Sequence, residues 1–135
     1  FLTENIMPIE ASGRLKHIPV PHKDILHNTS LGFDVFFANG HTDKQMIPMI
    51  SYKGKTICFM ADLLPTVGHI SVPFVMGYDT RPLLTLDEKE RFLKLAADKN
   101  YYLLLEHDAH NELITVKHTE KGVRLNNIHH FKNLF

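Results

Sequence analysis

Residues 55–64 read Lys-Thr-Ile-Cys-Phe-Met-Ala-Asp-Leu-Leu, an apolar run that ends in a single carboxylate. Thr56–Met60 is almost continuously apolar, which predicts a strand covered on both faces. The run Gln45–Tyr52 precedes it across Lys53-Gly54, a pair that tolerates the positive φ of a tight hairpin turn. The stretch therefore predicts a hairpin whose second strand is buried and delivers Asp62 at its end.

Around this hairpin, the patterns predict further strands in a mixed α/β chain. Short apolar runs at Ile6–Ile9, Leu15–Val20 and Asp24–Leu26 are separated by Pro, Gly and polar residues, which favours strands of a meander over helices. Other expected strands are 33–38, 101–105, 112–118 and 122–125.

One helix is predicted, after a long connection. The segment Ala61–Arg81 is interrupted by Pro and Gly, and so long a connection in a compact chain is often functional. Thr85 is the expected N-cap, with Glu88 three residues on as its capping-box partner, and an apolar face continues until Asp98-Lys99-Asn100. One helix cannot cover both faces of such a sheet, so we expect one face to be bare.

Composition sets limits on the class of protein. The 135 residues are 44% hydrophobic and 22% charged, which indicates a single globular unit over residues 1–135. The net charge of zero lacks the signature of nucleic-acid binding, and no apolar run approaches the ~20 residues of a membrane span. Cys58 alone excludes an intrachain disulfide or a cysteine-based zinc site, and it is expected to be a core residue. We expect a soluble, cytoplasmic domain without nucleic-acid or membrane partners.

Two features are less ordinary. Ten histidines are several times normal usage, and the chain begins at Phe1 without an initiator Met, which suggests a fragment. Residues with ligand chemistry follow three predicted strands: Gly40-His41-Thr42-Asp43, Ala61-Asp62-Leu63 and Glu106-His107-Asp108. Strand ends are where functional groups collect, and imidazoles with a carboxylate suit zinc or a similar divalent ion.

These motifs, in this order and spacing around a helix, resemble the last three metal-binding motifs of the metallo-β-lactamase superfamily. The middle motif of that superfamily is usually Gly-Asp, and Ala61 takes the place of the Gly here. The stretch from Asp62 to Asp79 is most similar to the esterase, lactonase and phosphotriesterase-like branches. The resemblance implies the C-terminal half of an αββα sandwich with a mixed sheet and few helices.

The resemblance also implies roles for individual residues. His41 would bind the first of two zinc ions, Asp62 would bridge both and be the catalytic carboxylate, and His107 would bind the second. A hydroxide between the ions would attack an ester, lactone, thioester or phosphoester of a small-molecule substrate. Thr42 and Asp108 are expected to orient the imidazole rings.

His69 and Tyr78 are expected to line the substrate pocket, with Asp79 at the same rim. His110, His129 and His130 are expected on the surface. No Gly-rich phosphate loop and no Gly-x-Ser-x-Gly motif is present.

One departure from the superfamily is large. Its His-x-His-x-Asp-His motif is absent, since no two histidines here are separated by a single residue. We therefore interpret the chain as the C-terminal part of an enzyme about twice as long, inactive alone and holding at most three of the ligands. The bare sheet face predicts self-association or binding of the missing N-terminal half. Two alternatives stay open: a non-catalytic interaction module on the same scaffold, and a mononuclear metal-binding domain that uses His41, Asp62 and His107.

Overall fold

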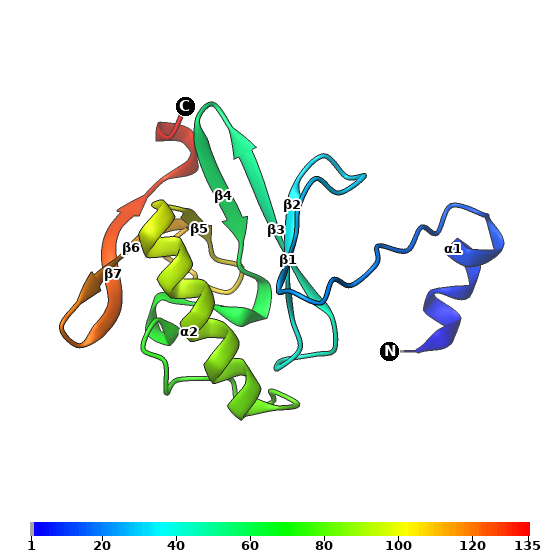
Figure 1. Ribbon diagram of the computed structural model, residues 1–135, viewed down its shortest axis with the longest axis horizontal. Helices are drawn as coiled ribbons and strands as arrows, with labels where there is room; N and C mark the ends of the chain where they lie inside the picture. The colour runs from blue at the N-terminus through cyan, green and yellow to red at the C-terminus, as the bar shows by residue number, and fades with distance from the viewer. Residues whose placement is uncertain (1) are drawn as a thin grey trace.

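The hairpin around Lys53-Gly54 forms the middle of a seven-stranded sheet in the computed structural model, which describes residues 2–135 (Figure 1). Strand β3 (Gln45–Tyr52) pairs antiparallel with β4 (Lys55–Phe59). Lys53 and Gly54 have φ angles of +48° and +77°, as the tight turn requires. The predicted hairpin is confirmed.

The sheet order follows the chain order from β1 to β7. The remaining strands are β1 (Ile25–Leu26), β2 (Asp34–Ala38), β5 (Tyr102–Leu104), β6 (Leu113–Thr119) and β7 (Gly122–His129). All neighbouring pairs are antiparallel except β4 and β5, which are parallel and are connected through the helix α2 (Pro82–Lys99). This mixed sheet with few helices confirms the predicted α/β class.

Helix α2 begins earlier than the sequence predicts. Arg81 occupies the N-cap and Pro82 the first helical position, where its missing N–H costs nothing. Thr85 lies inside the first turns and donates to the Arg81 carbonyl, and Glu88 turns toward the β2–β3 loop, so the predicted capping box is wrong. The predicted end is confirmed, because Asn100 closes the helix in the left-handed conformation with a φ of +53°.

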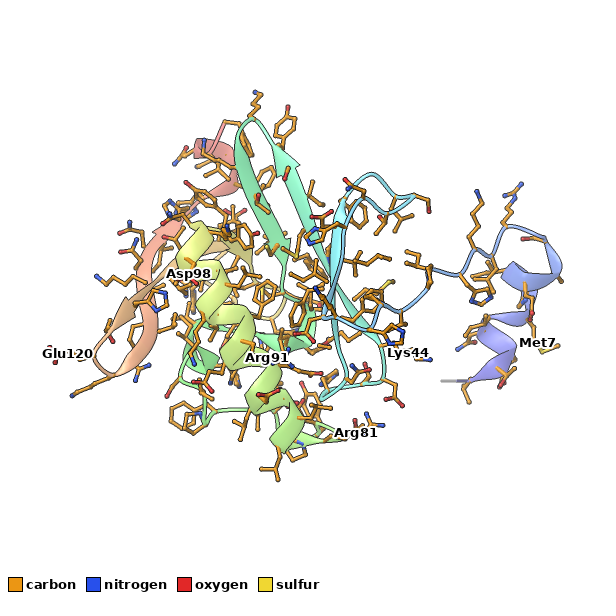
Figure 2. The ribbon with its side chains drawn as sticks, viewed as in Figure 1. Met7, Lys44, Arg81, Arg91, Asp98 and Glu120 are labelled. Carbon is orange, nitrogen blue, oxygen red and sulfur yellow. The ribbon has the colours of Figure 1, made fainter. Side chains whose placement is uncertain are left out.

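The N-terminal prediction is partly wrong. Ile6–Ile9 lies at the short helix α1 (Met7–Ala11), in which Pro8 sits in the first turn, and no strand forms over 15–20. Of the three short strands expected there, only β1 forms. Figure 1 shows α1 standing away from the sheet, and Figure 2 places the Met7 side chain on this separate arm.

The two faces of the sheet differ. On one face, α2 buries Phe92, Leu93 and Ala96 against the strands, including Phe36 and Cys58. Cys58 is fully buried, and burial raises the pKa of its thiol well above the ordinary range, so it behaves as the core residue that was expected.

No α-helix covers the opposite face within residues 2–135 (Figure 1), and only the C-terminal 3₁₀ turn Phe131–Asn133 brings Leu134 against Ile57 and Leu113 there. Met46, Ile50 and Tyr52 of β3 lie there, and each is more than 40% exposed. The bare face predicted from the helix count is therefore present around β3. Across residues 2–135, no helix combines the length and apolar character needed to cross a membrane.

Candidate metal centre

Three ligand-type side chains leave the sheet at the same edge. Strands β2 and β5 both run in the direction of β4, because β3 is antiparallel to β2 and to β4 and β5 is parallel to β4. His41, Asp62 and His107 each lie three residues beyond the end of one of these strands. The register pairs Phe59 with Leu104, so the loops that carry Asp62 and His107 start level with one another.

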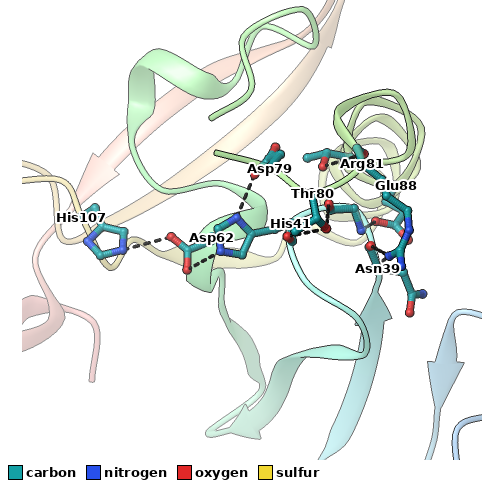
Figure 3. Close-up of polar contacts among 10 residues, drawn as sticks. Asn39, His41, Asp62, Asp79, Thr80, Arg81, Glu88 and His107 are labelled. Atoms are coloured by element: carbon teal, nitrogen blue, oxygen red, sulfur yellow. Dashed lines mark hydrogen bonds and ion pairs between the residues drawn. The ribbon is translucent and has the colours of Figure 1, made fainter. Parts of the chain in front are cut away.

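The three side chains meet (Figure 3). His41 Nε2 lies 3.4 Å from Asp62 Oδ2, and His107 Nε2 lies 3.1 Å from Asp62 Oδ1. Each carboxylate oxygen therefore faces a different imidazole. The site is open on one side, since the His107 side chain is 49% exposed while that of His41 is 13% exposed.

A residue in the left-handed backbone conformation positions Asp62. The chain turns out of β4 through Met60 into the 3₁₀ turn Ala61–Leu63, and Ala61 has a φ of +42°. This region is unfavourable for a residue with a Cβ and open to glycine. A glycine before the Asp, as in the resembled superfamily, would adopt this backbone conformation without cost. Ala61 adopts the same left-handed conformation, at a cost in backbone energy.

Asp79 orients His41. The side chain of Asp79 is fully buried, and its Oδ1 lies 2.8 Å from His41 Nδ1 (Figure 3). Since a carboxylate only accepts, Nδ1 donates its proton to Asp79, and this contact directs Nε2 toward Asp62. The sequence assigned this orienting role to Thr42 and placed Asp79 at the pocket rim. The structure places Asp79, not Thr42, on the ring nitrogen.

The loop that carries His41 is fixed by the start of α2. Glu88 accepts hydrogen bonds from the backbone N–H groups of Asn39 and Gly40 at 2.8 and 2.9 Å. Gly40 packs directly on the helix, since a Cβ there would lie 2.3 Å from the backbone nitrogen of Thr85. Gly40 therefore permits a close approach of loop and helix that no other residue allows.

Asp108 holds a loop and not a ring. Its carboxylate accepts backbone N–H bonds from Val67, His110 and Asn111 at 3.0 to 3.1 Å. Burial opposes its ionisation, but these bonds outweigh burial and lower the pKa of Asp108 below its usual value. The predicted contact of Asp108 with an imidazole ring is therefore wrong within residues 2–135, and Asp108 instead holds the backbone of the loops around it.

The residues predicted to line the pocket lie on the same long connection. The ring of Tyr78 packs edge-on against that of His41 with 5.7 Å between centroids, and Tyr78 is 63% exposed. His69 Nδ1 lies 2.8 Å from Thr66 Oγ1. Burial, and then the charge of Lys89, lower the pKa of His69, and Asp79 opposes them. Tyr78 therefore borders the metal-type ligands directly, and His69 belongs to the loop behind them.

Glu106 is a further possible donor, to which the sequence motif Glu106-His107-Asp108 assigned no role. Ligand atoms of Asp62, Glu106 and His107 all lie within 4.8 Å of one another. The only signal in the sequence was its position beside His107. One imidazole and two carboxylates within these distances, with His41 Nε2 3.4 Å from Asp62, are nitrogen and oxygen donors of the kind that divalent zinc accepts, so the residues present fit such an ion.

Over the part that it covers, the chain has the fold of the metallo-β-lactamase superfamily, which confirms the predicted resemblance at the level of the fold. A probable metal-dependent hydrolase from Staphylococcus aureus matches with a TM-score of 0.68 and 22% identity, over 92% of this chain and 42% of its own. AbOPH, a hydrolase of the β-lactamase superfamily, matches with a TM-score of 0.71 and 20% identity, over 93% and 42%. AidC, a dizinc quorum-quenching lactonase in complex with a product, matches with a TM-score of 0.71 and 20% identity, over 95% and 42%.

The chain thus spans less than half the length of these solved structures. No protein-family model and no curated protein matches the sequence.

Proposed function

We propose that this chain is the C-terminal portion of a metal-dependent hydrolase and supplies part of its metal centre. The observation that carries the proposal is the meeting of His41, Asp62 and His107 at one sheet edge, with one oxygen of Asp62 toward each imidazole. A carboxylate between two imidazoles is suited to bridging two divalent ions. The fold shared with metal-dependent hydrolases supports the same conclusion.

Each residue then has a defined task. His41 and His107 would hold an ion through Nε2, and Asp79 accepts from Nδ1 of His41, which directs Nε2 to the site. When bound, zinc or a similar ion supplies Lewis-acid polarisation of the scissile group and lowers the pKa of water. Tyr78, beside His41 at the open side, is placed to contact the substrate.

The rest of the enzyme supplies what this chain lacks. The chain covers 42% of the three solved structures, and we propose that the remaining portion carries further ligands and covers the bare face around β3. The substrate class is an ester, lactone, thioester or phosphoester of a small molecule. The lactonase neighbours with bound product favour a lactone among these.

Zinc titration of the chain, followed by competition with a chromophoric chelator, tests the metal centre. Loss of a ligand costs at least as much as the about tenfold loss in affinity seen when the partner that orients a ligand is removed. We therefore expect His107→Ala to weaken zinc binding by about tenfold or more. His110→Ala, three residues away and exposed, is the matched control and should bind as the wild type does. Equal binding by the two variants, or no zinc binding by the wild type, would contradict the proposal.

A mononuclear metal-binding domain is the second candidate, favoured by the donor cluster of Asp62, Glu106 and His107. The number of zinc ions bound and the residues that hold them distinguish this candidate from the hydrolase portion. A mononuclear domain binds one zinc tightly in this chain alone and loses it in Glu106→Ala. The hydrolase portion binds weakly alone and gains affinity when the remaining portion of the enzyme is added.

A further inference from the structure

We propose that Glu88 and Lys89, adjacent on α2, are positioning residues that hold the two loops carrying His41 and its partner Asp79. The inference rests on the proposed function, because it concerns the orientation of a proposed ligand. It assigns to helix α2 a task beyond covering the sheet.

Glu88 holds the first loop. Its side chain is 3% exposed, and its two oxygens accept the N–H groups of Asn39 and Gly40 separately. Both N–H groups lie one or two residues before His41. A buried carboxylate is stable only when its oxygens are satisfied, so this pairing fixes the backbone at the exit of β2.

Lys89 holds the second loop. It is 1% exposed, and its Nζ donates to the backbone carbonyls of Ser71, at 3.4 Å, and Phe74. Burial lowers the pKa of Lys89 to about 8, and the nearby Asp79 carboxylate acts in the opposite direction. An ammonium buried at this cost, with carbonyls of one loop as its acceptors, ties that loop to the helix.

The position of Asp79 depends on that loop. Its Oδ1 contacts His41, but its buried Oδ2 has no hydrogen-bond partner within residues 2–135. The side chain is therefore not held by a network of its own. Its location follows from the backbone, which turns through the bond from Asp79 N–H to the Met76 carbonyl and continues from the segment that Lys89 anchors.

Adjacent residues on a helix project about 100° apart, so Glu88 and Lys89 reach in different directions from one turn. One holds the loop before His41, and the other holds the loop before Asp79. Together they set the spacing between the ring and the Asp79 carboxylate, which keeps that carboxylate on Nδ1 and directs Nε2 of His41 toward Asp62.

Two readouts on the metal-free and zinc-titrated chain test this role. Long-range ¹⁵N–¹H spectra of the imidazoles report the tautomer of His41 without metal, and chelator competition reports zinc affinity. In Lys89→Met, we expect the His41 signals to shift from the Nδ1–H tautomer toward a mixture, and zinc affinity to fall about tenfold. Lys94→Met, on the same helix but with a 57% exposed side chain, is the matched control and should change neither readout.

Lys89→Arg retains a donor to the two carbonyls and should restore both readouts at least in part, which a merely volume-filling role would not produce. Should Lys89→Met fail to fold by circular dichroism, Glu88→Gln carries the test, because it removes one of two acceptors and leaves the helix intact. A folded Lys89→Met or Glu88→Gln with wild-type His41 signals and zinc affinity would overturn the inference. Wild-type chain that shows the Nδ1–H tautomer but binds no zinc would instead overturn the proposed function alone.

Discussion

Ala61→Gly tests whether the backbone conformation that positions Asp62 is strained. Ala61 has a φ of +42°, in the left-handed region, where an L-residue with a Cβ is disfavoured by about 1–2 kcal/mol. Glycine removes this cost, but it also gives the unfolded chain more freedom, worth about 0.4–1 kcal/mol against the folded state. Loss of the partly buried methyl group opposes the gain further.

Ala97→Gly is the matched control. Ala97 is also partly buried against the same core cluster, but it lies within α2, where glycine costs about 1 kcal/mol. The methyl loss and the unfolded-state entropy are common to both variants, so they cancel in the comparison. The difference between the two isolates the strain at residue 61.

Urea unfolding followed by circular dichroism measures the free energy of unfolding. We expect Ala97→Gly to lose about 1 kcal/mol and Ala61→Gly to lie between no change and a gain of about 1 kcal/mol, with unchanged m-values. The predicted gap is thus about 1–2 kcal/mol. If both variants lose stability equally, the left-handed backbone at residue 61 carries no strain and the reasoning fails.

Three further perturbations follow from the packing. Gly40→Ala forces a Cβ onto the α2 backbone and should cost about 1–3 kcal/mol in chemical denaturation, whereas Gly77→Ala, with open space around it, should change stability by less than about 0.5 kcal/mol. Burial lowers the pKa of Lys89 from 10.5 to about 8, so between pH 8 and pH 10.5 the unfolded chain binds more protons than the folded chain. The free energy of unfolding, relative to that of Lys89→Met, should therefore rise by on the order of 3 kcal/mol over this pH range. A difference that does not change with pH would contradict a buried charge at Lys89. Ile50→Lys on the bare face should shift sedimentation toward monomer, while Leu83→Lys on the outside of α2 should not.

Local patterns were sufficient to predict most strands and that His41, Asp62 and His107 follow strand ends. The apolar run before Asp62 and the Lys53-Gly54 turn are features of a few consecutive residues, and they specify a hairpin without reference to the rest of the chain. The convergence of His41 and His107 on Asp62 is less local. It was inferred from strand ends and from the resemblance, and the parallel pairing of β4 with β5 provides its physical basis.

Local patterns failed where two interpretations fit the same residues. A four-residue apolar run such as Ile6–Ile9 fits a strand or one helical turn equally, and Pro8, which suits a helix start, decided in favour of α1. Thr85 and Glu88 have the spacing of a capping box, but Glu88 binds two N–H groups 48 and 49 residues earlier in the sequence. Long-range partners of this kind leave no periodic signal.

The division between what was predictable and what was not follows the architecture of the site. The metal-type donors extend three residues beyond strand ends, so their positions are determined by the sheet, and sheet strands can be recognised from short patterns. The ring of His41, by contrast, is in contact with Asp79, 38 residues away, and the loops before these two residues contact Glu88 and Lys89 of α2 through backbone atoms only. A chain that retained the strands and lost these contacts would keep His41 in its sequence but not the contact that directs Nε2 toward Asp62. Ligand motifs alone are therefore weaker evidence for a working metal centre than ligand motifs accompanied by a buried carboxylate on Nδ1.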